Sequence, residues 1–242
     1  MTRNLTFIIL FVGLAVGIAY AGQNVIIPRP GTYDYFHYLP CADNEADTVV
    51  TDRGTSGAWT ATVNTNALYD ATERCFSMNA NTDELRANDN ITFEKLQIRW
   101  HEKYHQADCL TEETKFFFSD DDDDETNLDA NEFFLKRLAY DQWEFRARGN
   151  ADADQAWIIS TDYGSQDTLW HVYKLTLDAS QAPWTVDLQQ CDAGGENCVS
   201  VTWGAWQNDS PSIAVFNNPL QVGFGVWEPE SYLKNITVED QT

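Results

Sequence analysis

Residues 101–105 read His-Glu-Lys-Tyr-His and match the H-E-x-x-H pattern of zinc peptidases. In that chemistry a helix places both imidazoles on one face, and the glutamate lies beside the metal-bound water. Residues 96–100 alternate as a strand does, and a strand separates residues i and i+4 by about 13 Å. We therefore expect His101 and His105 to be exposed at the end of a strand, and the sequence predicts no metal ligands.

Six consecutive acidic residues run from Asp120 to Glu125. Carboxylate oxygens are the ligands that Ca²⁺ prefers, so calcium is the one candidate cofactor. The run lacks the alternating spacing and the glycine of a calcium-binding loop, and adjacent like charges repel one another. The sequence predicts a solvated acidic loop over residues 119–131.

Nine tryptophans are many for a chain of 242 residues. Some must lie in the core, because aromatic side chains supply large buried areas. Residues 203–209 and 227–232 combine indoles with polar side chains, which is typical of sites where rings stack on a ligand and amides fix its orientation. The sequence predicts that these ligand contacts are Trp203, Trp206, Asn208 and Trp227.

Catalysis on polysaccharide is the alternative chemistry. Glycoside hydrolysis needs two carboxylates about 5–10 Å apart. Glu228 and Glu230 would share one face of a strand, and His171 is a further acid–base candidate. Because 38 acidic residues bring some such pair together by chance, we assign no catalytic residue and favour a chain that is not an enzyme.

Short runs of aromatic and β-branched residues must position these groups. Glycine, aspartate, asparagine and proline separate the runs, and no stretch of more than ten residues has a helical period. Residues 67–86 are predicted to hold one short helix. Many short strands at this spacing predict a β-sandwich or barrel. Strands are predicted at 33–39, 58–63, 91–100, 133–138, 143–148, 156–160, 169–177, 184–188, 199–203, 213–216, 220–226 and 232–238.

Residues 1–21 have the pattern of a secretory signal peptide, with Arg3, an apolar core over 5–18 and small residues Ala19 and Ala21 at the cleavage site. Its removal would leave residues 22–242 as one β-sandwich domain and change the net charge from −23 to −24. The acidic balance disfavours nucleic acid as a partner. No other apolar run reaches the ~20 residues of a membrane span. We expect a secreted, extracellular protein.

Disulfides are the default for cysteines in an oxidising compartment. Cys191 and Cys198 flank a turn-rich hexapeptide and are predicted to staple one hairpin loop. Of Cys41, Cys75 and Cys109, two could pair in any combination, and the odd thiol could link two chains or stay a buried free cysteine. Three sequons predict exposed glycosylated segments at Asn90, Asn208 and Asn235.

Two stretches carry a family resemblance. Residues 168–178 read Thr-Leu-Trp-His-Val-Tyr-Lys-Leu-Thr-Leu-Asp and, with 184–187, 219–225 and 232–239, resemble paired and closing strands of concanavalin A-like and laminin-G-like sandwiches. Residues 145–148, 152–160 and 222–227 resemble the farnesoic acid O-methyltransferase-like domain. Both resemblances cover about residues 131–240. They imply an all-β, antiparallel jelly-roll sandwich with long loops and little helix, which recognises carbohydrate or protein.

Polysaccharide lyases also use this sandwich, and residues 83–86 and 97–99 are similar to two lyase motifs. Thr82 and Arg99 stand where that family has an arginine and its catalytic histidine, so we assign no lyase activity. The expected function is that of a secreted, lectin-like glycoprotein module that binds a glycan or an extracellular protein. The alternatives are a glycoside hydrolase or lyase and a structural matrix or surface glycoprotein, the latter as a disulfide-linked oligomer.

Overall fold

A computed structural model shows the fold of the unit Asp34–Thr242. Residues 1–34, which include the predicted signal peptide, lie outside the part that is described. So do the acidic loop from Asp120 onward, with its calcium candidate, and the predicted strand at 213–216. The described residues are 35–41, 50, 52–55, 59–62, 69–78, 83–87, 91–104, 113–119, 133–138, 142–148, 155–161, 168–180, 184–207, 221–225 and 231–241.

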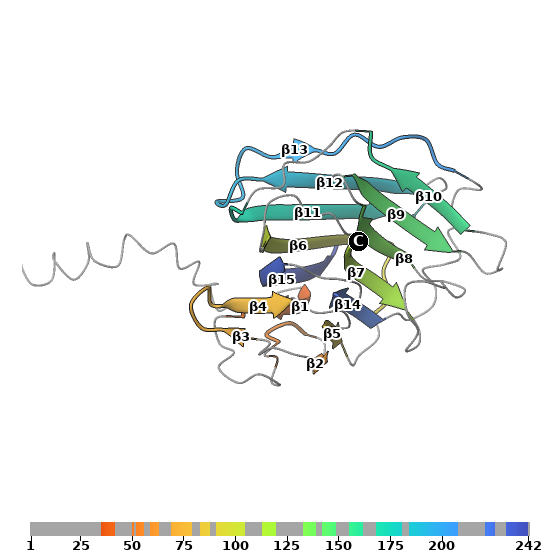
Figure 1. The fold of residues 1–242 in the computed structure, drawn as a ribbon. Helices are drawn as coiled ribbons and strands as arrows, with labels where there is room; N and C mark the ends of the chain where they lie inside the picture. Colours follow the sequence, from red (N-terminus) through yellow and green to blue (C-terminus); the bar gives the residue numbers. More distant parts are fainter. Residues whose placement is uncertain are drawn as a thin grey trace, which may run out of the picture. The chain divides into compact units, whose positions relative to one another are not determined.

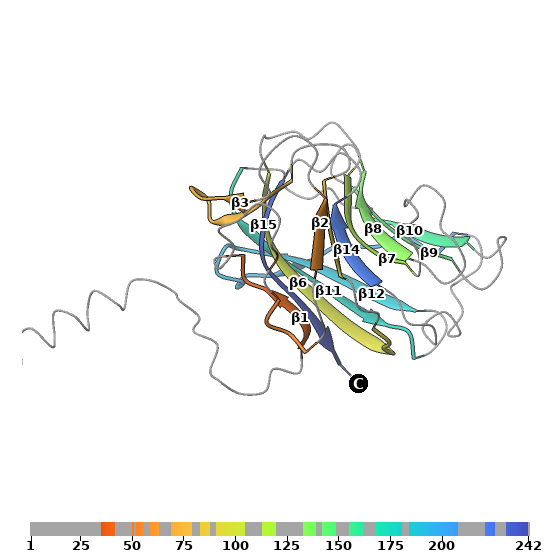
Figure 2. The same cartoon turned by 90° about the horizontal axis from the view of Figure 1, so that it is seen from below.

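Two antiparallel β-sheets face each other in this unit (Figures 1 and 2). The eight-stranded sheet has the order β13 (Val199–Ser200), β12 (Thr185–Cys191), β11 (His171–Asp178), β6 (Lys95–Tyr104), β15 (Ser231–Asp240), β4 (Cys75–Met78), β3 (Tyr69–Asp70), and β1 (Tyr35–Leu39) also pairs with β15. The seven-stranded sheet has the order β10 (Gln155–Ile159), β9 (Trp143–Arg148), β8 (Phe133–Arg137), β7 (Glu113–Ser119), β14 (Gln221–Gly225), β5 (Glu84–Ala87), β2 (Trp59–Thr62). The predicted all-β antiparallel sandwich is confirmed, and no helix occurs in the described residues.

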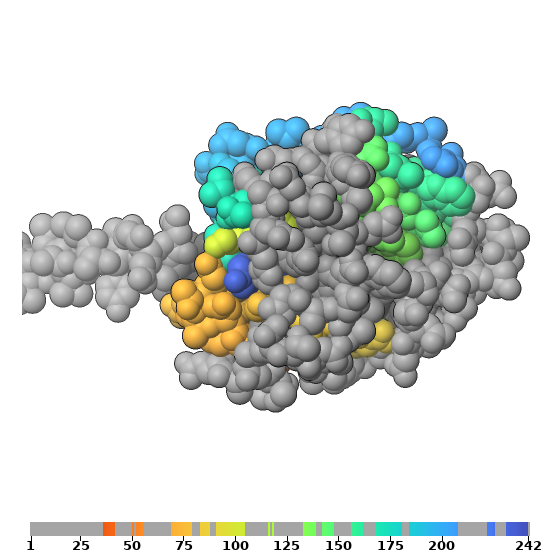
Figure 3. Space-filling model, viewed as in Figure 1, coloured from red at the N-terminus to blue at the C-terminus, as the bar shows by residue number. Residues whose placement is uncertain are grey.

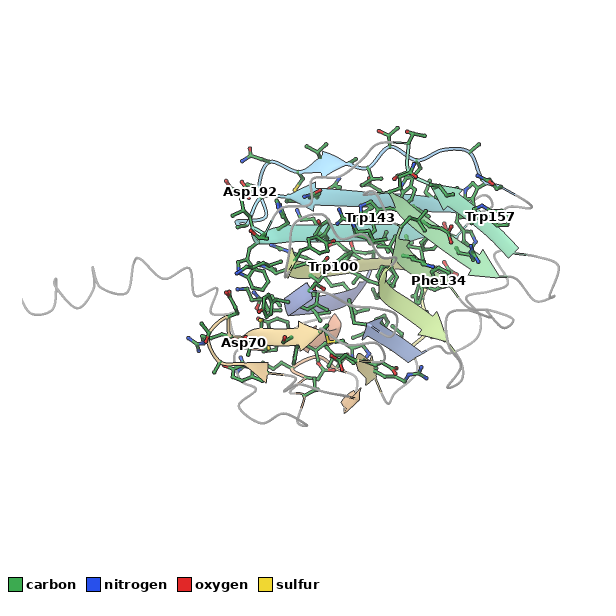
Figure 4. The ribbon with its side chains drawn as sticks, viewed as in Figure 1. Asp70, Trp100, Phe134, Trp143, Trp157 and Asp192 are labelled. Atoms are coloured by element: carbon green, nitrogen blue, oxygen red, sulfur yellow. A yellow bond between two sulfur atoms is a disulfide. The ribbon has the colours of Figure 1, made fainter. Side chains whose placement is uncertain are left out.

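The core lies between the sheets and is rich in aromatic rings. Trp100 of β6 stacks on Tyr173 of β11 at 5.3 Å and meets Phe116 of the opposite sheet edge-on at 6.0 Å. Tyr173 in turn meets Trp143 of β9 at 5.5 Å. Figure 4 shows Trp100 and Trp143 among the side chains of this interior. These contacts join the two layers, because ring pairs of this geometry are favourable beyond their area burial.

Strand β6 shows why the sequence folds this way. Its even-numbered residues from Leu96 to Tyr104 are buried and its odd-numbered residues are half-buried, so the strand has one core face and one outward face. On β11, Leu175 and Leu177 face the core, whereas Val172 lies opposite His101 on the outward face. The alternation predicted for residues 96–100 is confirmed.

The helix predicted within residues 67–86 is wrong. This stretch contains β3, the turn 71–74, β4 and the start of β5. All four residues of β4 are buried, so no period-two pattern marks the strand. Short strands covered on both sides cannot be distinguished from a helix by periodicity.

The predicted disulfide between Cys191 and Cys198 is confirmed. It closes the hairpin loop that joins β12 to β13, whose residues Gln189 and Gln190 pair with Ser200 and Val199. The Asp192 carboxylate fixes the loop by accepting the backbone N–H of Gly194 and Glu196 and the Asn197 amide. This loop folds over the outward face of β11, because a Cβ at Gly195 would lie 2.6 Å from Arg99 Nη2 and 3.7 Å from a methyl of Val172.

Candidate functional site

A group of aromatic and charged side chains lies on the outward face of the eight-stranded sheet, where β6, β15 and the start of β11 meet the turn after β3. Register pairing places Tyr232 beside Lys103 and Lys234 beside His101. Figure 3 shows the β3–β4 segment in orange together with the blue of β15 and the yellow-green end of β6 at one end of the molecule. We name this group the Trp170 cluster; its members are Glu73, His101, Lys103, Trp170, Tyr232 and Lys234.

The centre of the cluster is a cation on an aromatic face. Lys234 Nζ lies 3.6 Å from the centre of the Trp170 ring, and both side chains are half-buried. Burial lowers the pKa of Lys234, with smaller opposing effects from neighbouring thiols and Glu73. Among the described residues Lys234 makes no ion pair with a carboxylate. The negative face of the indole holds the ammonium instead.

Glu73 connects the turn to the sheet. The Asp70 carboxylate, labelled in Figure 4, accepts the backbone N–H of Thr72 at 2.8 Å and of Glu73 at 2.9 Å, so the turn is held in place. The Lys103 ammonium donates to Glu73 Oε1 at 2.8 Å, and the Trp170 indole donates to the same carboxylate. The bond from Lys103 is the main reason that the pKa of Glu73 is lowered. Glu73 therefore orients both the ring and a second ammonium.

His101 is the neutral member of the cluster. Burial, with the nearby cations of Arg99 and Lys234, lowers its pKa to about 4. The imidazole is therefore uncharged at neutral pH and can accept or donate a hydrogen bond. With Lys103 and Tyr232 it gives the cluster polar groups next to an aromatic ring, which is the composition of a small-ligand site.

The zinc-peptidase pattern does not form its metal site here. Residues His101 to Tyr104 continue the extended strand β6 beyond the predicted end at residue 100, so the helical spacing that the motif requires is not present. His101, which we expected to be exposed, is half-buried. His105 lies outside the described residues. Within the described part of the chain, no three histidine, cysteine or acidic side chains converge as metal ligands.

The predicted platform lies at a different place. Trp203 pairs with Ser160, and Gln207 pairs with Trp157, so this segment runs along the free edge of β10. Trp206 meets Phe145 edge-on at 6.2 Å. Both Trp203 and Trp206 are half-buried against the core. Asn208 and Trp227, the other two predicted contacts, lie outside the described residues, so the four-residue platform stays a prediction.

The remaining predicted positions are distributed over the fold. His171 is half-buried with Nδ1 3.3 Å from the Cys191 carbonyl oxygen, whereas Glu228 and Glu230 lie outside the described residues. Asn235 is half-buried in β15 and has a φ of 49°, at the register shift between Lys234 and Thr237. This sequon is in a strand bulge, whereas we expected an exposed segment. The sequons at Asn90 and Asn208 lie outside the described part.

Sequence reasoning missed the Trp170 cluster. The spacing of Trp170 and Val172 in the sequence places them on one face of a strand, but β15, which supplies Lys234, is remote in sequence. Only the pairing of β6 with both β11 and β15 brings the ring and Lys234 together. The available signal was weak: Tyr232 and Lys234 alternate with apolar residues on a predicted strand.

Comparison with known proteins shows the fold alone. No family model and no curated protein sequence matches the chain. Among solved structures, a binding domain of botulinum neurotoxin DC in complex with SialylT is similar, with a TM-score of 0.55, 10% identity and coverage of 87% of this chain and 49% of that chain. A second similar structure is named for the cell entry of botulinum neurotoxin type C, which depends on interaction with two ganglioside molecules. Its TM-score is 0.53 and its identity is 10%, with coverage of 85% of this chain and 48% of that chain.

A third similar structure is the same DC binding domain with rat synaptotagmin II, at a TM-score of 0.52, 9% identity, and coverage of 86% of this chain and 49% of that one. The chain thus spans about half the length of these structures. The three are named for an interaction with two ganglioside molecules, a complex with SialylT and a complex with rat synaptotagmin II. Within the residues that our structure describes, no helix has the length and apolar character needed to cross a bilayer.

Proposed function

We propose that this chain is a secreted carbohydrate-binding module and that the Trp170 cluster binds an acidic glycan. The observation that carries the proposal is Lys234, a half-buried ammonium that rests on an indole and pairs with no described carboxylate. The chain has 38 acidic against 15 basic residues, so carboxylates are abundant. A ligand carboxylate would supply the partner that Lys234 lacks.

The rest of the cluster fits the same ligand. The half-buried rings of Trp170 and Tyr232 offer apolar contact to a sugar, and Lys103 and His101 offer hydrogen bonds to its hydroxyls. Charge-assisted hydrogen bonds from an ammonium are worth about 1.5–3 kcal/mol, about one to two orders of magnitude in affinity. The glycan and ganglioside named for the structural neighbours support a search among sialylated sugars.

The test is isothermal titration of the secreted protein with sialyllactose and with its neutral parent, lactose. We expect sialyllactose to bind more tightly, and Lys234→Met to lose about tenfold in affinity for sialyllactose with little effect on lactose. Trp170→Ala should weaken both sugars. Equal affinities for the two sugars, or an unaffected Lys234→Met variant, would refute the assignment of the site.

Two variants on the other sheet serve as matched controls. Trp157 is also half-buried with a cation over its ring, since the Arg146 guanidinium carbon lies 5.7 Å from the ring centre. Lys136 is a half-buried lysine of β8. Trp157→Ala and Lys136→Met should retain sialyllactose binding.

The predicted platform of Trp203, Trp206, Asn208 and Trp227 is the second location for the glycan. The edge position of residues 203–207 beside β10 supports it. Binding that survives Trp170→Ala and is lost in Trp206→Ala would place the ligand there. The concanavalin A-like, laminin-G-like and methyltransferase-like resemblances stay proposals at the level of family.

A further inference from the structure

Two cysteines lie at the ends of strands that pair with β15: Cys41 follows β1 by two residues, and Cys75 is the first residue of β4. Strand β6 pairs with one edge of β15, whereas β1 and β4 both pair with the other edge, end to end. The end of β1 and the start of β4 therefore approach the same point of β15. The pairs that fix this register are Leu39 with Ile236 and Phe76 with Leu233.

Continuing each antiparallel register leads to the same residue. Cys41 follows Leu39 by two positions, so the chain leaves β1 in the direction of Lys234. One position before Phe76, Cys75 lies level with Lys234. Among the described residues, the structure records no disulfide on either cysteine, but both chain ends are directed toward the same residue of β15, and a disulfide requires Cα atoms about 4.4–6.8 Å apart.

The electrostatics of Lys234 give independent support for this proximity. Cys75 and Cys41 are both among the groups that act on the pKa of its ammonium, each raising it. Both cysteines are completely buried. A single lysine side chain thus has both sulfurs in its neighbourhood, from two strands that are remote in sequence.

The backbone at Cys41 fits a cross-link as well. Its φ is 62°, in the left-handed region that non-glycine residues seldom adopt. It follows Pro40 directly after β1, so the chain turns out of the strand at this residue instead of running into β4. Such a conformation persists only where the surroundings hold it.

We propose that Cys41 and Cys75 form a second disulfide, which ties the end of β1 to the start of β4. Two thiols lose two protons and two electrons as the sulfur–sulfur bond forms. A small-molecule or protein disulfide, such as oxidised glutathione, accepts them and becomes two thiols. The thiolate of one cysteine attacks that oxidant, which forms a mixed disulfide and releases one thiol. The second cysteine then attacks the mixed disulfide and releases the other thiol.

The order of events follows from burial. Desolvation raises the pKa of Cys75 to about 12 in the folded protein, so its reactive thiolate is scarce once β4 has docked. The bond therefore forms while the chain is still folding. After folding it is inaccessible to reductants, as structural disulfides of secreted proteins are.

Peptide mapping of the intact secreted protein tests the pairing directly. After alkylation without reduction, trypsin places Cys41 in the peptide that ends at Arg53, Cys75 in residues 75–86 and Cys109 in residues 104–115. The three alternative pairs then differ in mass. We expect the first two peptides to be linked and Cys109 to be alkylated. Any link to Cys109 within the chain, or alkylation of Cys41 and Cys75, would overturn the proposal.

Two substitutions sharpen the result. Cys109→Ser should keep the link between the first two peptides, because Cys109 takes no part in it. The second test uses a Cys191→Ser/Cys198→Ser variant, which lacks the hairpin disulfide. When this variant is unfolded, reduced and refolded, its melting temperature should be lower than that of the same variant refolded without reductant. Adding Cys41→Ser and Cys75→Ser should abolish that sensitivity. A reductant effect that remains in this fourfold variant would contradict the pairing.

Discussion

The neutral histidine of the Trp170 cluster makes the stability of this protein depend on pH. His101 has a pKa of about 4 in the folded chain, because burial disfavours its charged form and the Arg99 and Lys234 cations add repulsion. A histidine in an unfolded chain titrates near pH 6.5. Between these values the unfolded state binds a proton that the folded state does not. The free energy of unfolding therefore falls as the pH falls from about 6.5 to 4.

The size of this effect follows from the two pKa values. At about pH 5 the group lowers the free energy of unfolding by about 2 kcal/mol, and near pH 4 by about 3 kcal/mol. The side chains that face His101 come from three strands: Arg99 from β6 itself, Lys234 from β15 and the apolar Val172 from β11. None of these carries a negative charge that would favour the imidazolium form.

The assay is urea unfolding followed by tryptophan fluorescence at about pH 7 and about pH 5, for the parent chain and for His101→Gln. The parent should lose about 2 kcal/mol more than the variant between the two pH values, and any constant cost of the substitution cancels. The reasoning is refuted if His101→Gln keeps the parent's pH dependence, or if NMR shows the His101 ring titrating near its ordinary pKa.

Three further substitutions test the fold. Gly225→Ala should cost about 1–3 kcal/mol, because φ is 93° and a Cβ would collide with the backbone oxygen of Asp83, whereas Gly194→Ala should stay within about 0.5 kcal/mol by thermal melting. Replacing Cys191 and Cys198 by serine should cost about 2 kcal/mol in urea unfolding, since the closed loop is short, and an unchanged midpoint would contradict this. Arg137→Ala should cost about 3–5 kcal/mol, because this fully buried side chain packs between two aromatic rings, whereas Arg137→Met should recover part of that loss.

The strands with one buried face could be predicted from the sequence. Leu96, Ile98 and Trp100 alternate with polar residues, and the structure places all three in the core. The hairpin disulfide was equally visible, because only six residues separate Cys191 from Cys198 in a turn-rich loop. Both features depend only on neighbours along the chain, and local patterns are what a single sequence records.

The order of the strands could not be predicted in this way. Strand β15 at the end of the chain lies between β6 on one side and β1 and β4 on the other. Nothing local to Tyr232 or Lys234 indicates which strands adjoin them. For the same reason the pairing of Cys41 and Cys75 stayed open, since their relation exists only through β15. Long-range register is fixed by the whole hydrophobic pattern and not by any one segment.

Lys234 differs from other cationic side chains of the described residues in its partner, and this difference makes the Trp170 cluster the first site to test. Arg86, Lys95, Lys103 and Arg146 each meet a carboxylate at 2.6–2.9 Å, as expected where acidic residues are in large excess. Lys234 is half-buried and bears the desolvation cost of its charge, yet an indole replaces the carboxylate. An aromatic face compensates such a cation only in part. An anionic ligand bound at this position would complete the compensation, so its affinity should fall as salt concentration rises and should be weakest in the Lys234→Met variant.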